Sequence, residues 1–206
     1  MSANAFSASD LCTAMLGAQP GVPLVVTVRS SFAFSAGGCA AWQDPGTNTL
    51  TPWVLNATQV VVIGACPGRN APLCFLDAAG LGRHFIVEGG ATLALYNLVL
   101  LNGATFGTYN RSAGFLVVWH NWELASGGAV GLHHLGQPGT GAVGLFVNVH
   151  FVNNSAVPPY FPGIPDQCWG FGGAAIVSYY ASADFVNCTF SGSLASYKAR
   201  GRACCR

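Results

Sequence analysis

The acidic residues are the first candidates for chemistry, because two or three converging carboxylates can cleave a glycosidic bond or hold calcium. The chain has seven Asp and Glu among 206 residues, and no two of them lie within ten residues of each other. A site would therefore need carboxylates from distant segments. We expect no catalytic residues, and a carboxylate groove is kept as the alternative. The residues that could form such a groove are Asp77, Glu88, Glu123, Asp166 and Asp184, with Arg83 or Arg111.

No residue spacing indicates a metal, nucleophile or phosphate site. His133 and His134 are adjacent, so on a strand they would point to opposite faces and could not bind one metal ion together. The sequence contains no C-x-x-C, G-x-S-x-G or phosphate-loop motif. We therefore predict neither a metal nor a cofactor.

Aromatic side chains are the remaining candidates for binding. A ring face can stack on a sugar without any charge, so aromatic residues in irregular segments could form a glycan site. Their alternative role is to cover the core. The candidates that we select are Trp119, Trp122, Tyr160, Phe161 and Trp169.

The cysteines and N-x-S/T sequons indicate an oxidising, secretory environment. Cys66 and Cys74 bracket the segment PGRNAPL and could close it as a disulfide, whereas Cys188 lies in an apolar pattern typical of a buried residue. We expect an extracellular or cell-surface protein, although the first residues show no signal peptide. The glycosylation candidates are Asn56, Asn110, Asn153 and Asn187.

The overall composition argues against two classes of partner. The net charge is +1, whereas nucleic-acid binding requires a basic patch, so we expect no nucleic-acid partner. No uninterrupted apolar stretch is long enough for a membrane helix. Only 7% of residues are charged and 27 are Gly, so polar uncharged residues or attached sugars must keep the surface soluble.

Three related segments indicate how the candidate residues are positioned. YNLVLLN, FVNVHFVN and DFVNCTFSG align so that Asn97, Asn148 and Asn187 share one column, at spacings of 51 and 39 residues. Asn tolerates a left-handed corner, and its amide can bond to the same amide one coil away. Apolar residues at alternate positions after each Asn would share one buried face. The pattern predicts a parallel β-helix, with a β-sandwich as the alternative.

The remaining elements fit one domain over residues 1–206. We expect residues 1–20 to form an N-terminal helical cap, with a helix over Ser9 to Gly17 and Ser9 as its N-cap. Residues 21–195 should form the coils, and residues 196–206 a disordered tail. Strand-like runs of four to six residues, each bounded by turn residues, follow from Leu24 onward.

The repeated motifs carry a family likeness over roughly residues 55 to 195. GGA at Gly127 and at Gly172, with FVNCTF from Phe185, resembles the repeats of the chlamydial polymorphic outer membrane proteins. VVVIGACPG, CFLDAAG and HFIVEGGATLALYNLVLLNG resemble coils of right-handed parallel β-helix proteins of the pectin-lyase type. The resemblance implies an all-β, right-handed parallel β-helix. It says little about activity, because this architecture hosts lyases, glycosidases and adhesins.

These observations favour a non-enzymatic β-helix domain of a cell-surface or cell-wall protein, either by itself or as a fragment of a larger one. Its loops would serve adhesion or glycan contact, with a cell-wall polysaccharide or another surface protein as partner. The alternative is a carbohydrate-active enzyme of the pectate lyase or glycoside hydrolase type. A third reading, a degenerate copy without activity, fits the same sequence.

Overall fold

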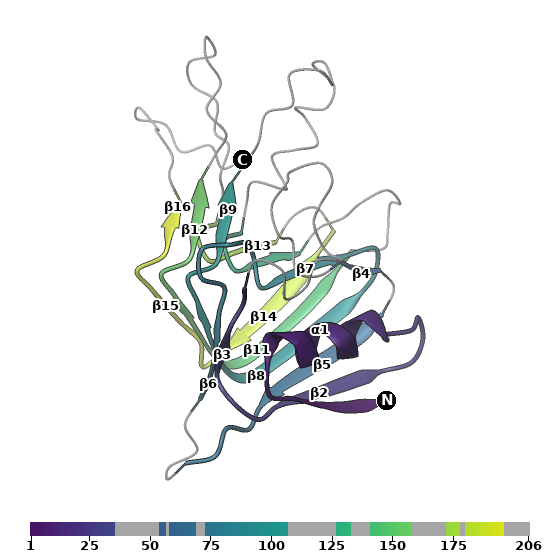
Figure 1. Cartoon of the computed structure of the whole chain (residues 1–206). Coiled ribbons are helices and arrows are strands. Elements are labelled where there is room, and N and C mark those ends of the chain that lie inside the picture. The colour runs from purple at the N-terminus through teal and green to yellow at the C-terminus, as the bar shows by residue number, and fades with distance from the viewer. Residues whose placement is uncertain are drawn as a thin grey trace, which may run out of the picture.

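The computed structural model describes residues 1–35, 54–56, 58–68, 73–106, 127–132, 141–157, 172–177 and 180–195 (Figure 1). These residues form short strands and one helix, α1 (Ala8–Leu16). The strands form three sheets, so the expectation of a mostly all-β chain is confirmed.

The first sheet runs in the order β1-β2-β5-β8-β11-β14, and β3, β6 and β15 attach to its flank. Its strands are β1 (Ser2–Ala5), β2 (Leu24–Val28), β3 (Phe32–Ala33), β5 (Gln59–Gly64), β6 (Cys74–Asp77), β8 (Thr92–Leu101), β11 (Val143–Val152), β14 (Ser182–Val186) and β15 (Thr189–Ser191).

The second sheet runs in the order β13-β10-β7-β4, and the third in the order β16-β12-β9. The strands of the second sheet are β4 (Val54–Asn56), β7 (Phe85–Glu88), β10 (Val130–Leu132) and β13 (Ala175–Val177). Those of the third are β9 (Ala104–Phe106), β12 (Ser155–Val157) and β16 (Leu194–Ala195).

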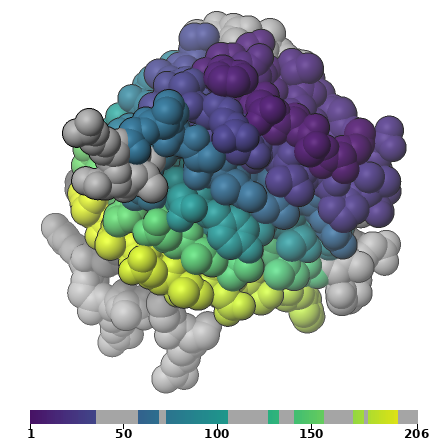
Figure 2. All heavy atoms as spheres, turned by 90° about the horizontal axis from the view of Figure 1, so that it is seen from below, coloured from purple at the N-terminus to yellow at the C-terminus, as the bar shows by residue number. Residues whose placement is uncertain are grey.

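All pairings within the three sheets are parallel, and the chain visits the sheets in a fixed order. From β7 onward it passes through the second, first and third sheets, as β7-β8-β9, then β10-β11-β12, then β13-β14-β15-β16. Each strand pairs in parallel with its equivalent in the previous pass. Figure 2 shows the result as layers, from the purple N-terminal segment to the yellow C-terminal one.

The core lies on the inward face of these strands. Leu98 pairs with Val149, and Leu100 pairs with Phe151, and all four side chains are fully buried. The positions between them alternate to the other face, where His150 is only half-buried. The predicted alternation is present after Asn148, whereas after Asn97 the intervening Val99 is also buried and after Asn187 Phe190 is 52% exposed.

The Asn column expected from the sequence forms a corner in the three layers of β8, β11 and β14. Asn97, Asn148 and Asn187 have φ of 55°, 54° and 52°, in the left-handed region that Asn tolerates. Asn148 Nδ2 donates to Asn97 Oδ1 at 2.9 Å, and Asn187 Nδ2 donates to Asn148 Oδ1 at 3.2 Å. β8 continues through the corner at Asn97 as one strand.

A second corner follows five residues after the first. Asn102 and Asn153 both have φ of 54°, and Gly192 takes the third place with φ of 61°. A Cβ at Gly192 would lie 2.1 Å from Asn153 Oδ1, so this layer has no room for a side chain at the position. The substitution of Asn by Gly preserves the corner and ends the side-chain column.

The N-terminal cap differs in two respects from the expected one. Residues 1–20 are not only helical, because β1 pairs in parallel with β2 before α1 begins. The N-cap is Ser7 and not Ser9: Ser7 Oγ accepts the amide of Asp10, and the Asp10 carboxylate accepts the Phe6 amide and the Ser7 hydroxyl. Gly17 ends the helix, as predicted. The buried side chains Ala8, Leu11, Cys12 and Met15 join the core beside β1 and β2.

Candidate functional site

The five aromatic candidates belong to two long connections between the third and second sheets. Trp119 and Trp122 lie between β9 and β10, and Tyr160, Phe161 and Trp169 lie between β12 and β13. All five are outside the described residues. The ends of the connections are described: β9 pairs with β12, and β10 pairs with β13. The two connections therefore leave from neighbouring strands and return to neighbouring strands.

The two GGA motifs fix the return of these connections. Gly127 and Gly172 have φ of 72° and 61°, a conformation that residues with a Cβ rarely adopt. A Cβ at Gly128 would lie 2.2 Å from the Gly173 oxygen, so consecutive layers approach closely through backbone. The amide of Ala129 donates to the Ala174 oxygen at 2.7 Å. The motifs thus hold the second connection directly beside the first where both re-enter the sheet.

The carboxylate alternative gains no support from the described acidic residues. Asp77 pairs with Leu101, which pairs with Val152, whereas Asp184 pairs with Leu145. Seven residues along β11 and three strand spacings across the sheet separate the two carboxylates, which amounts to roughly 15 Å or more. Paired carboxylates of glycosidases lie about 5–9.5 Å apart. Glu123, Asp166 and Arg111 are outside the described residues.

Three of the described residues proposed for the groove, Asp77, Arg83 and Glu88, have structural surroundings that argue against a role in binding a polysaccharide. Asp77 Oδ1 accepts the Ala79 amide at 2.8 Å and the Asn102 side-chain amide at 2.9 Å, so this carboxylate fixes the second corner. Arg83 and Glu88, at either end of β7, are both buried. Buried side chains at these positions cannot line an open groove for a polysaccharide.

His84 is the buried titratable residue that the sequence did not single out. It is fully buried beneath Phe34, and its Nε2 donates to the Leu76 oxygen at 2.8 Å. Burial lowers the pKa of His84 from 6.5 to about 4, against smaller raising effects of the Leu76 carbonyl and Asp77. His84 is thus a neutral core residue. Within the described part of the chain, no three His, Cys, Asp or Glu are grouped as metal ligands.

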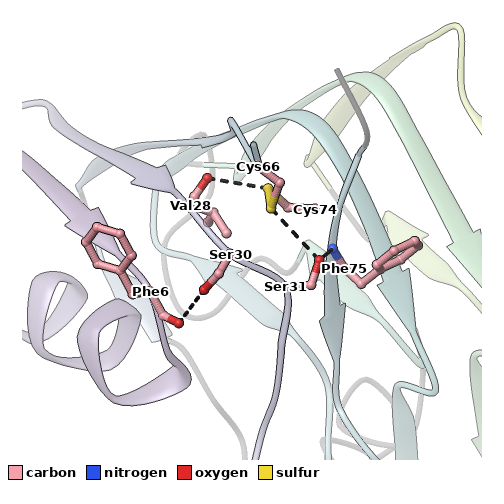
Figure 3. The surroundings of a disulfide bond; sticks show 7 residues. All are labelled: Phe6, Val28, Ser30, Ser31, Cys66, Cys74 and Phe75. Carbon is pink, nitrogen blue, oxygen red and sulfur yellow. Dashed lines mark hydrogen bonds between the residues drawn. A yellow bond between two sulfur atoms is a disulfide. The ribbon is translucent and has the colours of Figure 1, made fainter. Parts of the chain in front are cut away.

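The predicted disulfide between Cys66 and Cys74 is present, with a Cα–Cα distance of 5.4 Å. Figure 3 shows it beside the turn after β2, where Ser31 Oγ accepts the Phe75 amide at 2.9 Å and the Cys74 sulfur lies 3.4 Å from the Val28 oxygen. The bond thus closes the segment between β5 and β6 into a loop. Cys12 is also disulfide-bonded, whereas Cys188 is a free, half-buried thiol.

The glycosylation candidates occupy different environments. Asn153 and Asn187 are exposed and stand at the two corner columns. Asn187 also donates its side-chain amide to Asn148, so a glycan there would have to replace this bond. Asn56 is the last residue of β4, and Asn110 is outside the described residues.

One further structural Asn was not predicted from the sequence. Asn154 is fully buried between the second corner and β12, and it accepts the Gly103 amide at 2.7 Å and donates to the Leu100 oxygen at 3.0 Å. It replaces hydrogen bonds that the turning backbone lacks. The adjacent pair Asn153-Asn154 after a strand is the signal that could have identified it.

The comparisons with known proteins leave the chain without an identified relative. No protein-family model matches it, and no curated protein or solved structure has significant similarity to it. In the described residues, no helix is long and apolar enough to cross a membrane.

Proposed function

We propose that this chain is a right-handed parallel β-helix domain that binds a glycan or another surface protein through its connecting segments, without catalysis. The three sheets would be the faces of the helix, and each pass through them one coil. The fixed order of the sheets, the parallel pairing of successive passes and the Asn ladder support this architecture. Parallel crossovers are right-handed in almost all proteins, which favours that hand.

The observation that carries the functional proposal is the pairing of the strands that anchor the two aromatic connections. β9 and β12 are neighbours, as are β10 and β13. The five aromatic residues therefore belong to two connections whose ends are anchored on neighbouring strands. Stacked aromatic rings bind sugars without charge, in keeping with a chain that is only 7% charged.

The disulfides support an extracellular or cell-surface location. Cys66–Cys74 and the disulfide of Cys12 would persist only in an oxidising compartment. Two exposed sequons, at Asn153 and Asn187, are consistent with passage through a glycosylating pathway.

Binding of the full chain to a panel of cell-wall polysaccharides and surface-protein extracts tests this proposal. Trp119→Ala and Trp169→Ala, one from each connection, should each weaken binding at least 10-fold, because each removes a stacking face. Phe75→Ala is the matched control, since Phe75 is an exposed aromatic residue on β6, outside these connections. Equal losses in all three variants, or no loss in any, would refute a site on the connections.

A further inference from the structure

The last layer of the structure has one open side. β13, β14, β15 and β16 each pair with only one strand among the described residues, and in every case the partner belongs to the previous pass. Their remaining backbone amides and carbonyls form three edges at the same end of the molecule. Unpaired strand edges are templates for pairing with another chain.

The columns of inward-pointing side chains are not covered at this end of the molecule. Phe146 and Phe151 are 0% exposed, but Phe185 and Phe190, which continue their columns, are 39% and 52% exposed. Phe190 still stacks on Phe151 with ring centroids 4.7 Å apart and an interplanar angle of 4°. The inward-pointing rings therefore have a neighbour on one face and none of the described residues against the other.

The Asn ladder also ends here, at Asn187. Asn187 uses its Nδ2 to donate to Asn148, and no described residue donates to Asn187 Oδ1. Four further large apolar side chains of the last pass are exposed: Val177, Tyr180, Val186 and Leu194. The only charged side chain in residues 180–195 is Asp184, on the outward face of β14.

The opposite end of the layers is different, because α1 covers it. Ala5, Leu11 and Met15 close the interior there, and the outside of the helix carries Ser9 and Thr13 beside Leu16, which is 62% exposed. Among the described residues, uncovered interior rings therefore lie at the open end. A contact between two open ends buries these rings in both copies, whereas a head-to-tail contact buries them in one copy only.

We propose that the open end binds the open end of a second copy of this chain. The copies are related by a two-fold axis, so that their β14 and β15 edges pair in antiparallel fashion and Phe185 and Phe190 of both copies pack together. The near absence of charge on this face lets two identical surfaces meet without repulsion. Because a two-fold contact uses the same surface on both copies, the assembly closes at two copies and does not grow into a filament.

Sedimentation equilibrium of the 206-residue chain tests the proposal. The wild type should have twice the 21.3 kDa mass of one chain and dissociate on dilution. Phe190→Asp should raise the dissociation constant more than about 30-fold, because it places a charge at the centre of the contact. Val186→Lys should also raise the dissociation constant, because it places a charge on the outward face of the β14 edge and leaves the buried side chains unchanged.

Phe75→Asp is the control for these variants. Phe75 is also a strand residue, and its 46% exposure is close to the 52% of Phe190, but it lies on β6, which is not part of the open end. It should leave the dimer intact, and circular dichroism should confirm that all three variants fold. In hydrogen exchange, amides of residues 182–195 should become protected as the protein concentration rises. A monomer at all concentrations, polymers beyond two copies, or a dimer lost in Phe75→Asp and retained in Phe190→Asp and Val186→Lys would each overturn the proposal.

Discussion

Asn148 donates its side-chain amide to the side-chain oxygen of Asn97, 51 residues earlier, and both residues hold φ near 55°. The same side chain accepts from Asn187, so Asn148 is the middle rung of the ladder. One residue type thus satisfies two demands of the corner: a left-handed backbone, and an amide that bonds in both directions.

Substitutions at this rung should separate the two demands. Asn148→Gly removes the hydrogen bonds but keeps the left-handed conformation accessible, and we expect it to lower the free energy of unfolding by about 1–2 kcal/mol. Asn148→Ala removes the same hydrogen bonds and also forces a residue with a Cβ into the left-handed conformation. It should lower the free energy of unfolding by about 1 kcal/mol more than Asn148→Gly does. Urea unfolding measures both. An Ala variant as stable as the Gly variant would contradict the role of backbone conformation.

The two Phe of one column should respond very differently to truncation. Phe151→Ala removes a fully buried ring and should lower the free energy of unfolding by about 3–5 kcal/mol. If the wild type is less stable than that, the variant should show no cooperative unfolding transition. Phe190→Ala, at 52% exposure, should cost less than half as much when measured below the concentration at which copies associate. Similar costs for the two variants would mean that the last layer is covered in the monomer.

The Cys66–Cys74 disulfide should stabilise the fold chiefly by restricting the unfolded chain. For a sequence separation of 8, removal of the bond should cost about 2.5 kcal/mol. A Cys66→Ala/Cys74→Ala double variant tests this better than a reducing agent, which would also open the disulfide of Cys12. Thermal unfolding of wild type and double variant at one pH gives the difference. An unchanged midpoint would show that the bond does not constrain this segment.

His84 should make stability depend on pH in the acidic range. Its pKa is about 4 in the folded chain and 6.5 when unfolded, so the unfolded state binds more protons between these values. The stability that the neutral imidazole provides is fully present above pH 6.5 and is lost as the pH falls toward 4. The loss should reach about 3 kcal/mol at most. Urea unfolding between pH 7 and 4 measures it, and His84→Phe should flatten the slope. A wild-type slope in His84→Phe would assign the effect to other groups.

Several features of the fold could be predicted because they recur. The Asn corners recur in the last three layers, and a repeat makes a weak local pattern visible. β1 could not be recognised, since SANA consists of residues that are rare in strands and forms a strand because β2 offers it an edge. The N-cap was misplaced by two residues, because Ser7 and Ser9 are equally good caps locally. The reciprocal bonds between Ser7 and Asp10 decide between them.

The candidate site was less predictable for physical reasons. His84 is a single buried residue whose environment is made by distant segments, and no sequence period marks it. Asp77 and Asp184 lie far apart because register, which the sequence does not reveal, places them on different layers. Aromatic residues in irregular connections, such as Trp119, can be recognised by their type, but no periodic spacing in the sequence indicates where they lie. Only the pairing of their anchoring strands relates one connection to the other.

The central claim is passive binding by the connections, and one experiment tests it most directly. The full chain is titrated with cell-wall polysaccharides, and the bound fraction and the polymer length are measured on the same sample. We predict saturable binding of at least one polysaccharide or co-purified surface protein, with polymer length unchanged. Shortened polymer or unsaturated product would contradict the proposal and would favour the alternative of a carbohydrate-active enzyme with a carboxylate site. Absence of binding to every polysaccharide and surface protein would contradict the binding role itself.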